Sequence, residues 1–157
     1  MQLNITTDYA VRMTLYLAQQ GGVAAAAEIG RAMAIPSKYV KTVAKPLCDA
    51  GLLRAVRGAG GGFGLNLPPE KITMHAIVNV MEGTTRINRC LEGDGYCSRN
   101  GTQMCPVHRF YCQIQNELDR KFGAMTIARL LAQPAADTSS QKRNIEIEGE
   151  TCHESQA

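Results

Sequence analysis

The segment RGAGGG, at residues 57–62, contains four glycines within six residues and separates two short apolar stretches. Glycines clustered in this way are unfavourable inside a helix, and they permit the left-handed backbone conformations that tight turns need. Apolar residues flank the segment on both sides, at Leu53, Val56, Phe63, Leu65 and Leu67. This pattern predicts a two-stranded hairpin with a flexible glycine tip.

Three short helices are expected before the hairpin. Apolar residues recur at helical spacing over residues 7–20, 24–34 and 37–51. The second helix ends before Pro36, because the residue that precedes a proline is driven out of the helical conformation. Pro46 removes a backbone donor within the third helix, so we expect that helix to be bent or shortened there.

Two further helical patterns follow the hairpin. Residues 71–83 fit a short helix that ends at Gly83, and residues 107–132 form one long amphipathic pattern with Gly123 as a weak point. Because a long amphipathic helix near the end of a chain often packs against a second copy of itself, we expect a homodimer. Residues 133–157 are polar and acidic, and we expect them to be disordered.

Helix, helix, turn, helix and hairpin, in this order, predict a winged helix-turn-helix. The fold class is then mainly α, or α+β, with a DNA-binding domain and its connector helix at residues 1–83. A cysteine-rich loop follows at residues 84–106, and a dimerisation helix at residues 107–132. In such a unit the third helix enters the major groove of DNA and the hairpin meets the neighbouring minor groove. A protein–protein module with a solvated charged face fits the same order of elements.

Both DNA-facing elements carry groups suited to phosphates and base edges. The third helix offers Ser37, Lys38, Tyr39, Lys41 and Lys45, and the hairpin offers Arg54, Arg57, Gly58 and Gly60. The glycines allow the backbone to approach a phosphate closely. They do not form a dinucleotide-binding loop, because such a loop requires a helix directly after its glycines and a strand-like segment follows here.

The distribution of charge agrees with a nucleic-acid partner for the first half of the chain. The formal net charge is only +3, but residues 1–66 hold seven Lys and Arg against three Asp and Glu, while the last 25 residues are acidic. Asp8 and Arg12 interrupt the apolar residues near the N-terminus, so neither an export signal nor a membrane helix is indicated. We therefore expect a cytoplasmic protein that does not contact membranes.

Four of the six cysteines lie close together in the sequence, at Cys90, Cys97, Cys105 and Cys112. In a reducing compartment, clustered thiols are typical of metal ligation or redox sensing rather than of structural disulfides. Structural zinc sites usually use cysteines two to four residues apart, and this loop has no such pair. Its longer gaps favour an iron-sulfur cluster, whose ligands are spread over several iron atoms.

The remaining thiols and the nearby histidine carry different expectations. Cys48 lies on the third helix and is expected to be a small buried apolar residue, and Cys152 in the tail is expected to be idle. For Cys112, packing and ligation are both open. His108 follows Cys105 by three residues, which places it one helical turn along and within reach of the same metal.

The chain resembles the Rrf2 family of bacterial transcriptional regulators, with its IscR-, NsrR- and RirA-like branches. The resemblance covers residues 1 to about 131. It rests on TTDYAVRMTLYLA, IPSKYVKTVAKPLCDAGLL and VRGAGGGFGLNLPPEKITMHAIVNVMEG, followed by the cysteine loop and the long helix. It implies a homodimer, joined by the long helix, that binds a partly palindromic double-stranded DNA operator. Most members with three loop cysteines hold a 2Fe-2S or a 4Fe-4S cluster.

The same resemblance implies a set of cluster ligands. Cys90, Cys97 and Cys105 match the three ligand cysteines of the family. His108 matches the histidine that completes the site in IscR-like members, and Asp8 matches an aspartate that reaches across the dimer in NsrR-like members. The gaps between the cysteines are longer here than is common in the family, and Cys112 is an extra thiol, so the cluster type and the fourth ligand stay open.

The sequence therefore predicts a DNA-binding transcriptional regulator, a repressor rather than an enzyme. Its operator binding is expected to depend on an iron-sulfur cluster that senses nitric oxide, redox state or the supply of iron and clusters. The alternative is a zinc-stabilised or cluster-free winged-helix regulator that responds to thiol oxidation or to a small molecule. An electron-transfer or thiol-exchange enzyme is not indicated, because the chain lacks a C-x-x-C pair.

Overall fold

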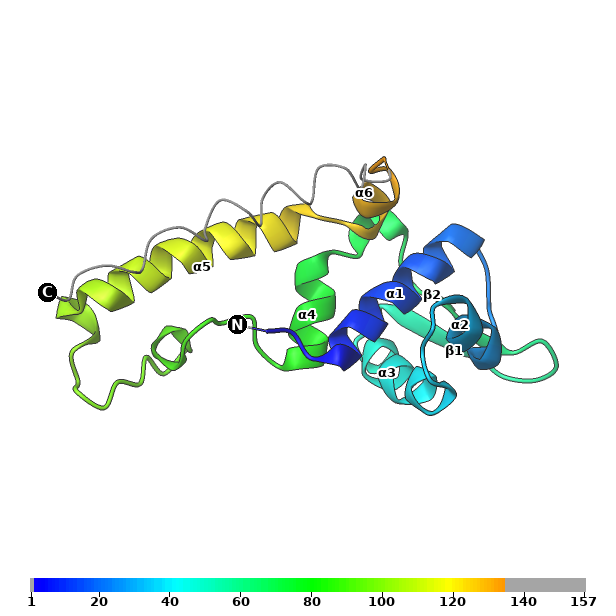
Figure 1. Ribbon diagram of the computed structural model, residues 1–157, viewed down its shortest axis with the longest axis horizontal. Helices are drawn as coiled ribbons and strands as arrows, with labels where there is room; N and C mark the ends of the chain where they lie inside the picture. The colour runs from blue at the N-terminus through cyan, green and yellow to red at the C-terminus, as the bar shows by residue number, and fades with distance from the viewer. Residues whose placement is uncertain (1, 135–157) are drawn as a thin grey trace, which may run out of the picture.

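The computed structural model describes residues 2–134 (Figure 1). The acidic tail beyond residue 134, with Cys152, lies outside the described residues. The α-helices and strands in chain order are α1 (Ile5–Gln20), α2 (Ala26–Ala32), α3 (Ser37–Asp49), β1 (Leu53–Val56), β2 (Gly62–Leu65), α4 (Met74–Glu82), α5 (Pro106–Ala124) and α6 (Ile127–Leu131). Three short 3-10 helices complete the fold: η1 (Pro69–Lys71), η2 (Arg89–Leu91) and η3 (Thr102–Met104). The predicted class, mainly helical with one small hairpin, is confirmed.

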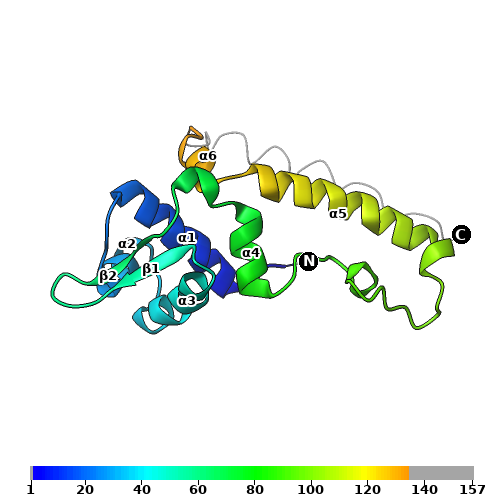
Figure 2. The same cartoon turned by 180° about the vertical axis from the view of Figure 1, so that it is seen from behind.

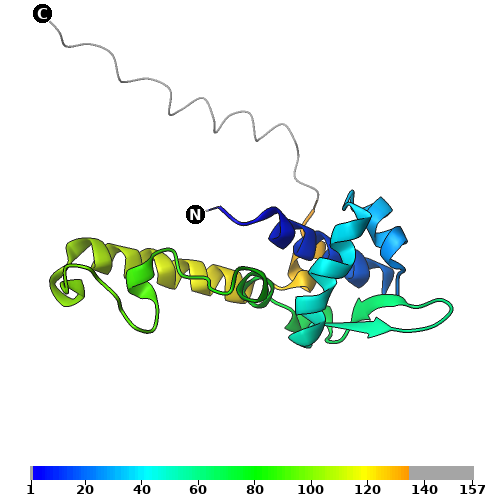
Figure 3. The ribbon, with the colours of Figure 1, turned by 90° about the horizontal axis from the view of Figure 1, so that it is seen from below.

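The helices α1, α2, α3 and α6 gather with the hairpin at one end of the molecule (Figures 1 and 2). We call this part, together with α4, the headpiece. From it α5 extends as a long arm, and the cysteine loop, residues 84–105, runs alongside that arm (Figure 3). No helix of the described residues is long and apolar enough to cross a bilayer.

The core of the headpiece forms where the apolar faces of its helices meet. The largest fully buried side chains are those of Met13, Leu17, Ile29, Val40, Val43, Leu47, Leu53, Ile72, Ile77, Val78 and Ile127. Complete burial of a side chain of this size contributes about 1.5–3 kcal/mol to stability. The first three helices are therefore held together by the apolar spacing seen in the sequence, since α1 and α3 supply five of these residues.

The hairpin pairs β1 with β2 in an antiparallel register that sets Leu53 opposite Leu65. Its second strand is also fixed on its other side, where Ala24 and Phe63 exchange two backbone hydrogen bonds of 2.9 Å. Gly62 is required at this junction, because a Cβ atom there would lie 2.0 Å from the carbonyl oxygen of Ala24. The link between α1 and α2 thus sets the direction in which the glycine tip points.

Several helix boundaries differ by two or three residues from the predicted ones, and those of α1 and α3 have a clear physical basis. α1 begins at Ile5, two residues earlier than expected, because Asn4 and Thr7 both bind the Glu82 side chain at the end of α4. α3 continues through Pro46 to Asp49 instead of stopping there. The carbonyl group deprived of its partner by Pro46 belongs to Thr42, which is exposed, so water can bind it.

The predicted single helix over residues 107–132 is wrong, because the chain forms α5 and α6 with a break between them. Met125 is extended, and the hydroxyl oxygen of Thr126 caps α6 by accepting a hydrogen bond from the N–H of Arg129. The expected weak point, Gly123, lies inside α5 and is not the site of the break.

The break arises because residues 125–127 pair with the segment before α4. The N–H of Met74 donates to the carbonyl of Met125 at 2.8 Å, and the N–H of Ile127 donates to the carbonyl of Ile72 at 2.9 Å. Ile127 itself is fully buried. Burial of this side chain and two backbone hydrogen bonds outweigh the gain from continuing the helix, so α6 returns to the headpiece.

Candidate functional site

The expected recognition helix, α3, presents a polar face on the surface of the headpiece. Ser37, Lys38 and Lys41 are exposed on it. Tyr39 is half-buried, and its ring lies between Tyr9, with centroids 5.8 Å apart, and the ammonium group of Lys38, 5.2 Å from the ring centroid. The face therefore combines exposed cations with one half-buried aromatic ring.

Lys45 stands apart from the other predicted DNA contacts of α3. Its ammonium nitrogen lies 2.7 Å from the carboxylate of Asp49, one helical turn away. Hydrogen bonding to Asp49, followed by its charge, raises the pKa of Lys45. Both side chains are exposed, so this ion pair is weak and can open when a phosphate approaches.

The hairpin places its predicted DNA contacts along its exposed edge and tip. The guanidinium Nε of Arg54 donates to the carbonyl of Leu65 at 3.1 Å, which holds the side chain across the two strands. Arg57 is exposed at the tip. Gly58 and Gly60 have φ values of +98° and +76°, a backbone region that strongly favours glycine.

A thiol and imidazole cluster lies where the cysteine loop meets the first turns of α5. Cys105 is the N-cap of α5, and its sulfur accepts a hydrogen bond of 3.4 Å from the backbone N–H of His108. The Nδ1 atom of His108 lies 3.3 Å from the sulfur of Cys90, and its Nε2 atom lies 3.5 Å from the sulfur of Cys112. We call these four residues the thiol cluster.

The periodicity of α5 explains why three members of the thiol cluster meet. Residues 105, 108 and 112 are spaced by three and four, so they share one helical face. Cys90 comes to the same face from η2. The structure thus brings together three of the predicted ligands, Cys90, Cys105 and His108, and adds Cys112, for which the sequence left packing and ligation open.

The thiol cluster is not a ready-made site for a single metal ion. The sulfurs of Cys90 and Cys112 contact different nitrogens of the same ring, so the three groups do not converge on one point. Accordingly, no group of three His, Cys, Asp or Glu side chains within residues 2–134 has the geometry to hold one metal ion. Thiolates are soft donors that select soft metals, so the chemistry of the residues is compatible with zinc or with an iron-sulfur cluster.

Cys97 lies apart from the thiol cluster, in the glycine-rich part of the loop. It lines a cavity of about 210 Å³ together with Cys105 and Arg99. Hydrogen bonds from the backbone N–H groups of Gly101 and Arg99 lower the pKa of the Cys97 thiol. Cys105 therefore lies between Cys97 on one side and the rest of the thiol cluster on the other.

Two further predicted positions lie in the headpiece rather than near the loop. Asp8 is on α1, where its carboxylate pairs with Arg12 at 2.5 Å. Within one chain, the structure does not bring Asp8 to the loop cysteines. Cys48 is half-buried on α3 beside the core, where burial raises the pKa of its thiol.

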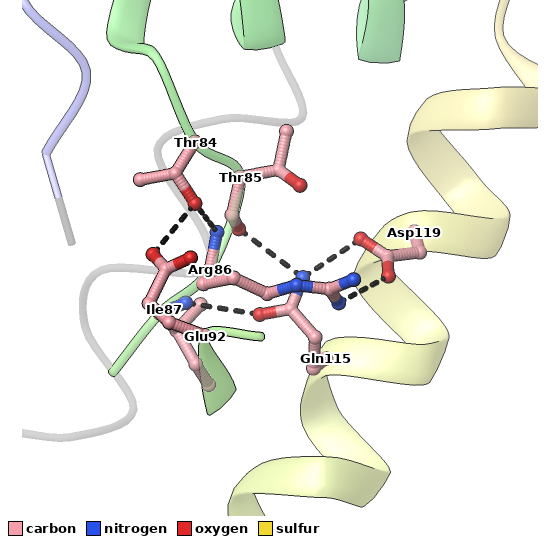
Figure 4. A network of polar contacts seen from close by, with 7 residues as sticks. All are labelled: Thr84, Thr85, Arg86, Ile87, Glu92, Gln115 and Asp119. Atoms are coloured by element: carbon pink, nitrogen blue, oxygen red, sulfur yellow. Dashed lines mark hydrogen bonds and ion pairs between the residues drawn. The ribbon is translucent and has the colours of Figure 1, made fainter. Parts of the chain in front are cut away.

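Gln115 is a functional candidate that the sequence analysis missed. Its side chain is only 2% exposed, and it binds the segment between α4 and Cys90 (Figure 4). The side-chain amide donates to the carbonyl of Thr85 at 3.1 Å and to Asp119 at 2.7 Å, and the side-chain oxygen accepts from the N–H of Ile87. The only sequence signal is its position on the helical face of His108 and Cys112.

An ion pair and a further hydrogen bond lie next to this contact. Arg86 pairs with Asp119 at 2.9 Å, and the hydroxyl of Thr84 donates to Glu92 at 2.8 Å (Figure 4). We refer to residues 84–92, the first part of the cysteine loop, as the connector; it follows α4 and contains Cys90. α5 and the connector, which carries Cys90, are thus joined by several polar contacts.

Comparisons with known proteins agree with this architecture. The model of the Rrf2 family, described as an iron-dependent transcriptional regulator, matches residues 3–133. The chain is 37% identical to protein aau3 of Rhizobium meliloti over 93 residues, which are 59% of this chain and 60% of that protein. It is 25% identical over 148 residues to the HTH-type transcriptional regulator IscR of Aliivibrio salmonicida, covering 93% of this chain and 86% of that protein.

A solved structure shows the same fold. CymR (YrzC), the global cysteine regulator of B. subtilis, superposes with a TM-score of 0.71 at 22% identity, covering 86% of this chain and 99% of that one. The predicted winged helix-turn-helix and the expectation of a regulator instead of an enzyme are confirmed. The chain belongs to the Rrf2 family and is a DNA-binding transcriptional regulator.

Proposed function

We propose that this regulator is a homodimeric repressor whose operator binding is controlled by an iron-sulfur cluster. The observation that carries the proposal is the thiol cluster, which gathers three sulfurs and an imidazole at the junction of the loop and α5. Cys90, Cys97 and Cys105 would hold the cluster, with a fourth donor from His108, Asp8 or Cys112. When bound, the cluster would link the loop to α5. Reaction with nitric oxide or oxidants, or a shortage of iron, would remove this link.

The protein's own residues connect this junction to the headpiece. Gln115 binds the connector three residues before Cys90, and the connector leads directly to α4. α4 in turn binds α1 through Glu82, whose carboxylate accepts hydrogen bonds from Asn4 and Thr7. A change in how the loop lies on α5 therefore has a short, polar route to the helices that carry the DNA-facing groups.

The operator would be bound by two copies of the headpiece. α3 would enter the major groove with Ser37, Lys38, Tyr39, Lys41 and Lys45, and the hairpin would meet the minor groove with Arg54, Arg57, Gly58 and Gly60. Two half-sites on one face of B-DNA lie about 34 Å apart. A small rotation of one copy relative to the other is enough to prevent both from docking. A change in the position of α5 would therefore change the affinity for the operator.

The exposed face of α5 supports the homodimer. Val107, Phe110 and Ile114 are exposed apolar residues spaced by three and four, so they share a face. His108, Cys112 and Gln115 lie on a different side of the helix. Apolar side chains aligned along one exposed helix face are typical of a contact between two chains.

Anaerobic purification followed by iron and sulfide assays and an ultraviolet-visible spectrum tests the proposed function. We expect a coloured protein that contains iron and sulfide, loss of the colour in Cys97→Ala, and unchanged colour in the control Cys48→Ala. Protein that is colourless and loaded with zinc contradicts the proposal. Titration with nitric oxide, while operator binding is measured, then tests the signal.

One observation favours a second candidate, a cluster-free regulator that responds to thiol oxidation. The lowered pKa of Cys97 increases its thiolate fraction, and thiolates are the form that oxidants attack. In that case iron-free protein would lose DNA binding on peroxide treatment, and Cys97→Ala would not. The same assays of iron and sulfide decide between the two functions.

A further inference from the structure

We infer that the DNA interface extends beyond α3 and the hairpin onto α1, where Arg12 binds a phosphate of the DNA backbone and the ring of Tyr9 positions it. The inference starts from the DNA-binding role of this regulator. It goes beyond the interface proposed above, which contains no residue of α1, and it does not involve the thiol cluster.

Arg12 lies at one end of a row of cations and aromatic rings that joins α1 to α3. Its guanidinium carbon lies 5.9 Å from the ring centroid of Tyr9. The Tyr9 ring packs in turn on Tyr39, with centroids 5.8 Å apart, and the ammonium group of Lys38 lies 5.2 Å from the Tyr39 centroid. Both cations are within the distance of about 6 Å at which an aromatic ring attracts a cation. The row therefore places Arg12 next to the first turn of α3.

A second contact holds Arg12 beside the turn that precedes α3. Its Nη1 atom lies 3.5 Å from the carbonyl oxygen of Met33, the residue that follows α2. This turn occupies residues 33–36, and α3 begins at Ser37. In helix-turn-helix proteins the recognition helix contacts base edges with its N-terminal residues, and the helix before it crosses the DNA backbone. Arg12 thus lies beside both elements at the end that meets the duplex.

The present partner of Arg12 can give way to a phosphate. Arg12 pairs with Asp8, one helical turn away, and both side chains are 43% exposed. Exposed ion pairs contribute little to stability, because water and salt screen the two charges. A phosphate group offers the planar guanidinium two parallel hydrogen bonds. Arg12 is also the only cationic residue of α1, so it is the one residue of this helix suited to the DNA backbone.

The test measures binding of the full-length protein to a short duplex of mixed sequence by fluorescence anisotropy, since phosphate contacts do not depend on sequence. We expect Arg12→Ala to lower the slope of log affinity against log salt concentration by up to about 0.9. Its loss of affinity relative to wild type then shrinks by up to about 3.5-fold between about 50 and about 200 mM salt. Arg12→Lys keeps the charge and is expected to keep the slope. A wild-type slope in Arg12→Ala overturns the inference.

Tyr9→Leu tests the positioning role of the ring. We expect it to lower the slope in the wild-type protein and to leave the slope unchanged in Arg12→Ala, where no guanidinium remains to be positioned. Tyr9→Phe keeps the ring and is expected to keep the slope. A loss of stability alone would not change the salt dependence. An equal effect of Tyr9→Leu in both proteins contradicts the role given to Tyr9.

Two further variants in the same assay separate this inference from the proposed interface. Lys121→Ala removes an exposed cation from α5 and is expected to keep the slope. Arg57→Ala tests the hairpin tip. If Arg57→Ala lowers the slope and Arg12→Ala does not, the inference alone fails. If neither variant lowers the slope, the proposed interface fails with it.

Chemical modification of the unmutated protein gives a readout that does not depend on how a variant folds. Phenylglyoxal modifies exposed guanidinium groups, and mass spectrometry of the peptides locates the modified residues. We expect duplex DNA to protect Arg12 and to leave Arg129, which is exposed on α6, unprotected. Equal modification of Arg12 with and without DNA contradicts the inference.

Discussion

The side-chain oxygen of Gln115 on α5 accepts a hydrogen bond from the backbone N–H of Ile87, 2.9 Å away in the connector. The same side chain is almost completely buried and also binds Thr85. An apolar replacement leaves the Ile87 N–H and the Thr85 carbonyl without partners in a buried place. Gln115 is therefore the buried contact between α5 and the connector, beside the more exposed ion pair of Arg86 and Asp119.

Gln115→Leu is expected to lower the free energy of unfolding by about 1–3 kcal/mol, the cost of leaving buried polar groups unpaired. Urea denaturation followed by far-ultraviolet circular dichroism measures this loss. The matched control is Gln113→Leu, on the exposed side of the same helix. Equal stability of the two variants contradicts the role given to Gln115.

Arg57→Ala is expected to weaken binding to duplex DNA and to make it less sensitive to salt. Each phosphate contact contributes about 0.9 to the slope of log affinity against log salt concentration, so removal of one contact lowers the slope by about one. Fluorescence anisotropy between low and moderate salt measures it. Lys121→Ala, on the exposed surface of α5, serves as the control. An unchanged slope removes the hairpin tip from the DNA interface.

Ile114→Asp is expected to convert the homodimer to a monomer. The side chain is 40% exposed in the single chain and lies between Phe110 and Leu118 on the apolar face of α5. A carboxylate placed in the middle of an apolar contact loses its hydration without gaining a partner. Analytical ultracentrifugation reports the mass, with Gln113→Asp as the control. A dimer that persists in Ile114→Asp places the contact elsewhere.

Glu82 makes the stability of the headpiece depend on pH. Hydrogen bonds from the Thr7 hydroxyl and then from the Asn4 backbone lower the pKa of Glu82 from its ordinary value of 4.5. Because the folded state favours the carboxylate, its contribution is complete above the unfolded pKa and is lost as the pH falls through the lower, folded one. Wild type is thus expected to exceed Glu82→Gln in stability at pH 7, with the difference shrinking below about pH 4.

Urea denaturation of both proteins at several pH values measures this difference. The control is Glu117→Gln, an exposed carboxylate on α5. A stability difference between wild type and Glu82→Gln that stays constant down to acidic pH contradicts the assignment.

Gly62→Ala is expected to destabilise the hairpin. The added methyl group would lie 2.0 Å from the carbonyl oxygen of Ala24, so the junction between Ala24 and Phe63 must open or shift. Overpacking of this kind typically costs about 1–3 kcal/mol. Gly22→Ala is the matched control, since a Cβ atom there meets nothing within 4 Å. Thermal unfolding of the two variants shows the contrast, and equal midpoints contradict it.

The first four helices and the hairpin follow from the sequence because their determinants are local. Helical spacing of apolar residues, the proline after α2 and the glycine tip each specify structure over a few residues, and β1 and β2 form where the pattern places them. The same holds for the thiol cluster along α5, where spacings of three and four place Cys105, His108 and Cys112 on one face.

The break after α5 and the role of Gln115 depend on contacts between distant segments. Residues 125–127 have no strong helix breaker, and only their pairing with residues 72–74 ends the helix. Glutamine is usually found on protein surfaces, and Gln115 is buried only because the connector folds over it. A pattern read along the chain contains no information about which distant backbone group such a residue meets.

The pairing of residues 125–127 with the segment before α4 has a mechanical consequence for α5. Just beyond its C-terminal end this helix is joined to the headpiece through Thr126 and Ile127, and further along the helix Gln115 joins it to the connector. Because the connector leads into α4, both attachments end on the same segment, residues 72–87. We therefore expect a displacement of α5 to be passed to both ends of α4 together.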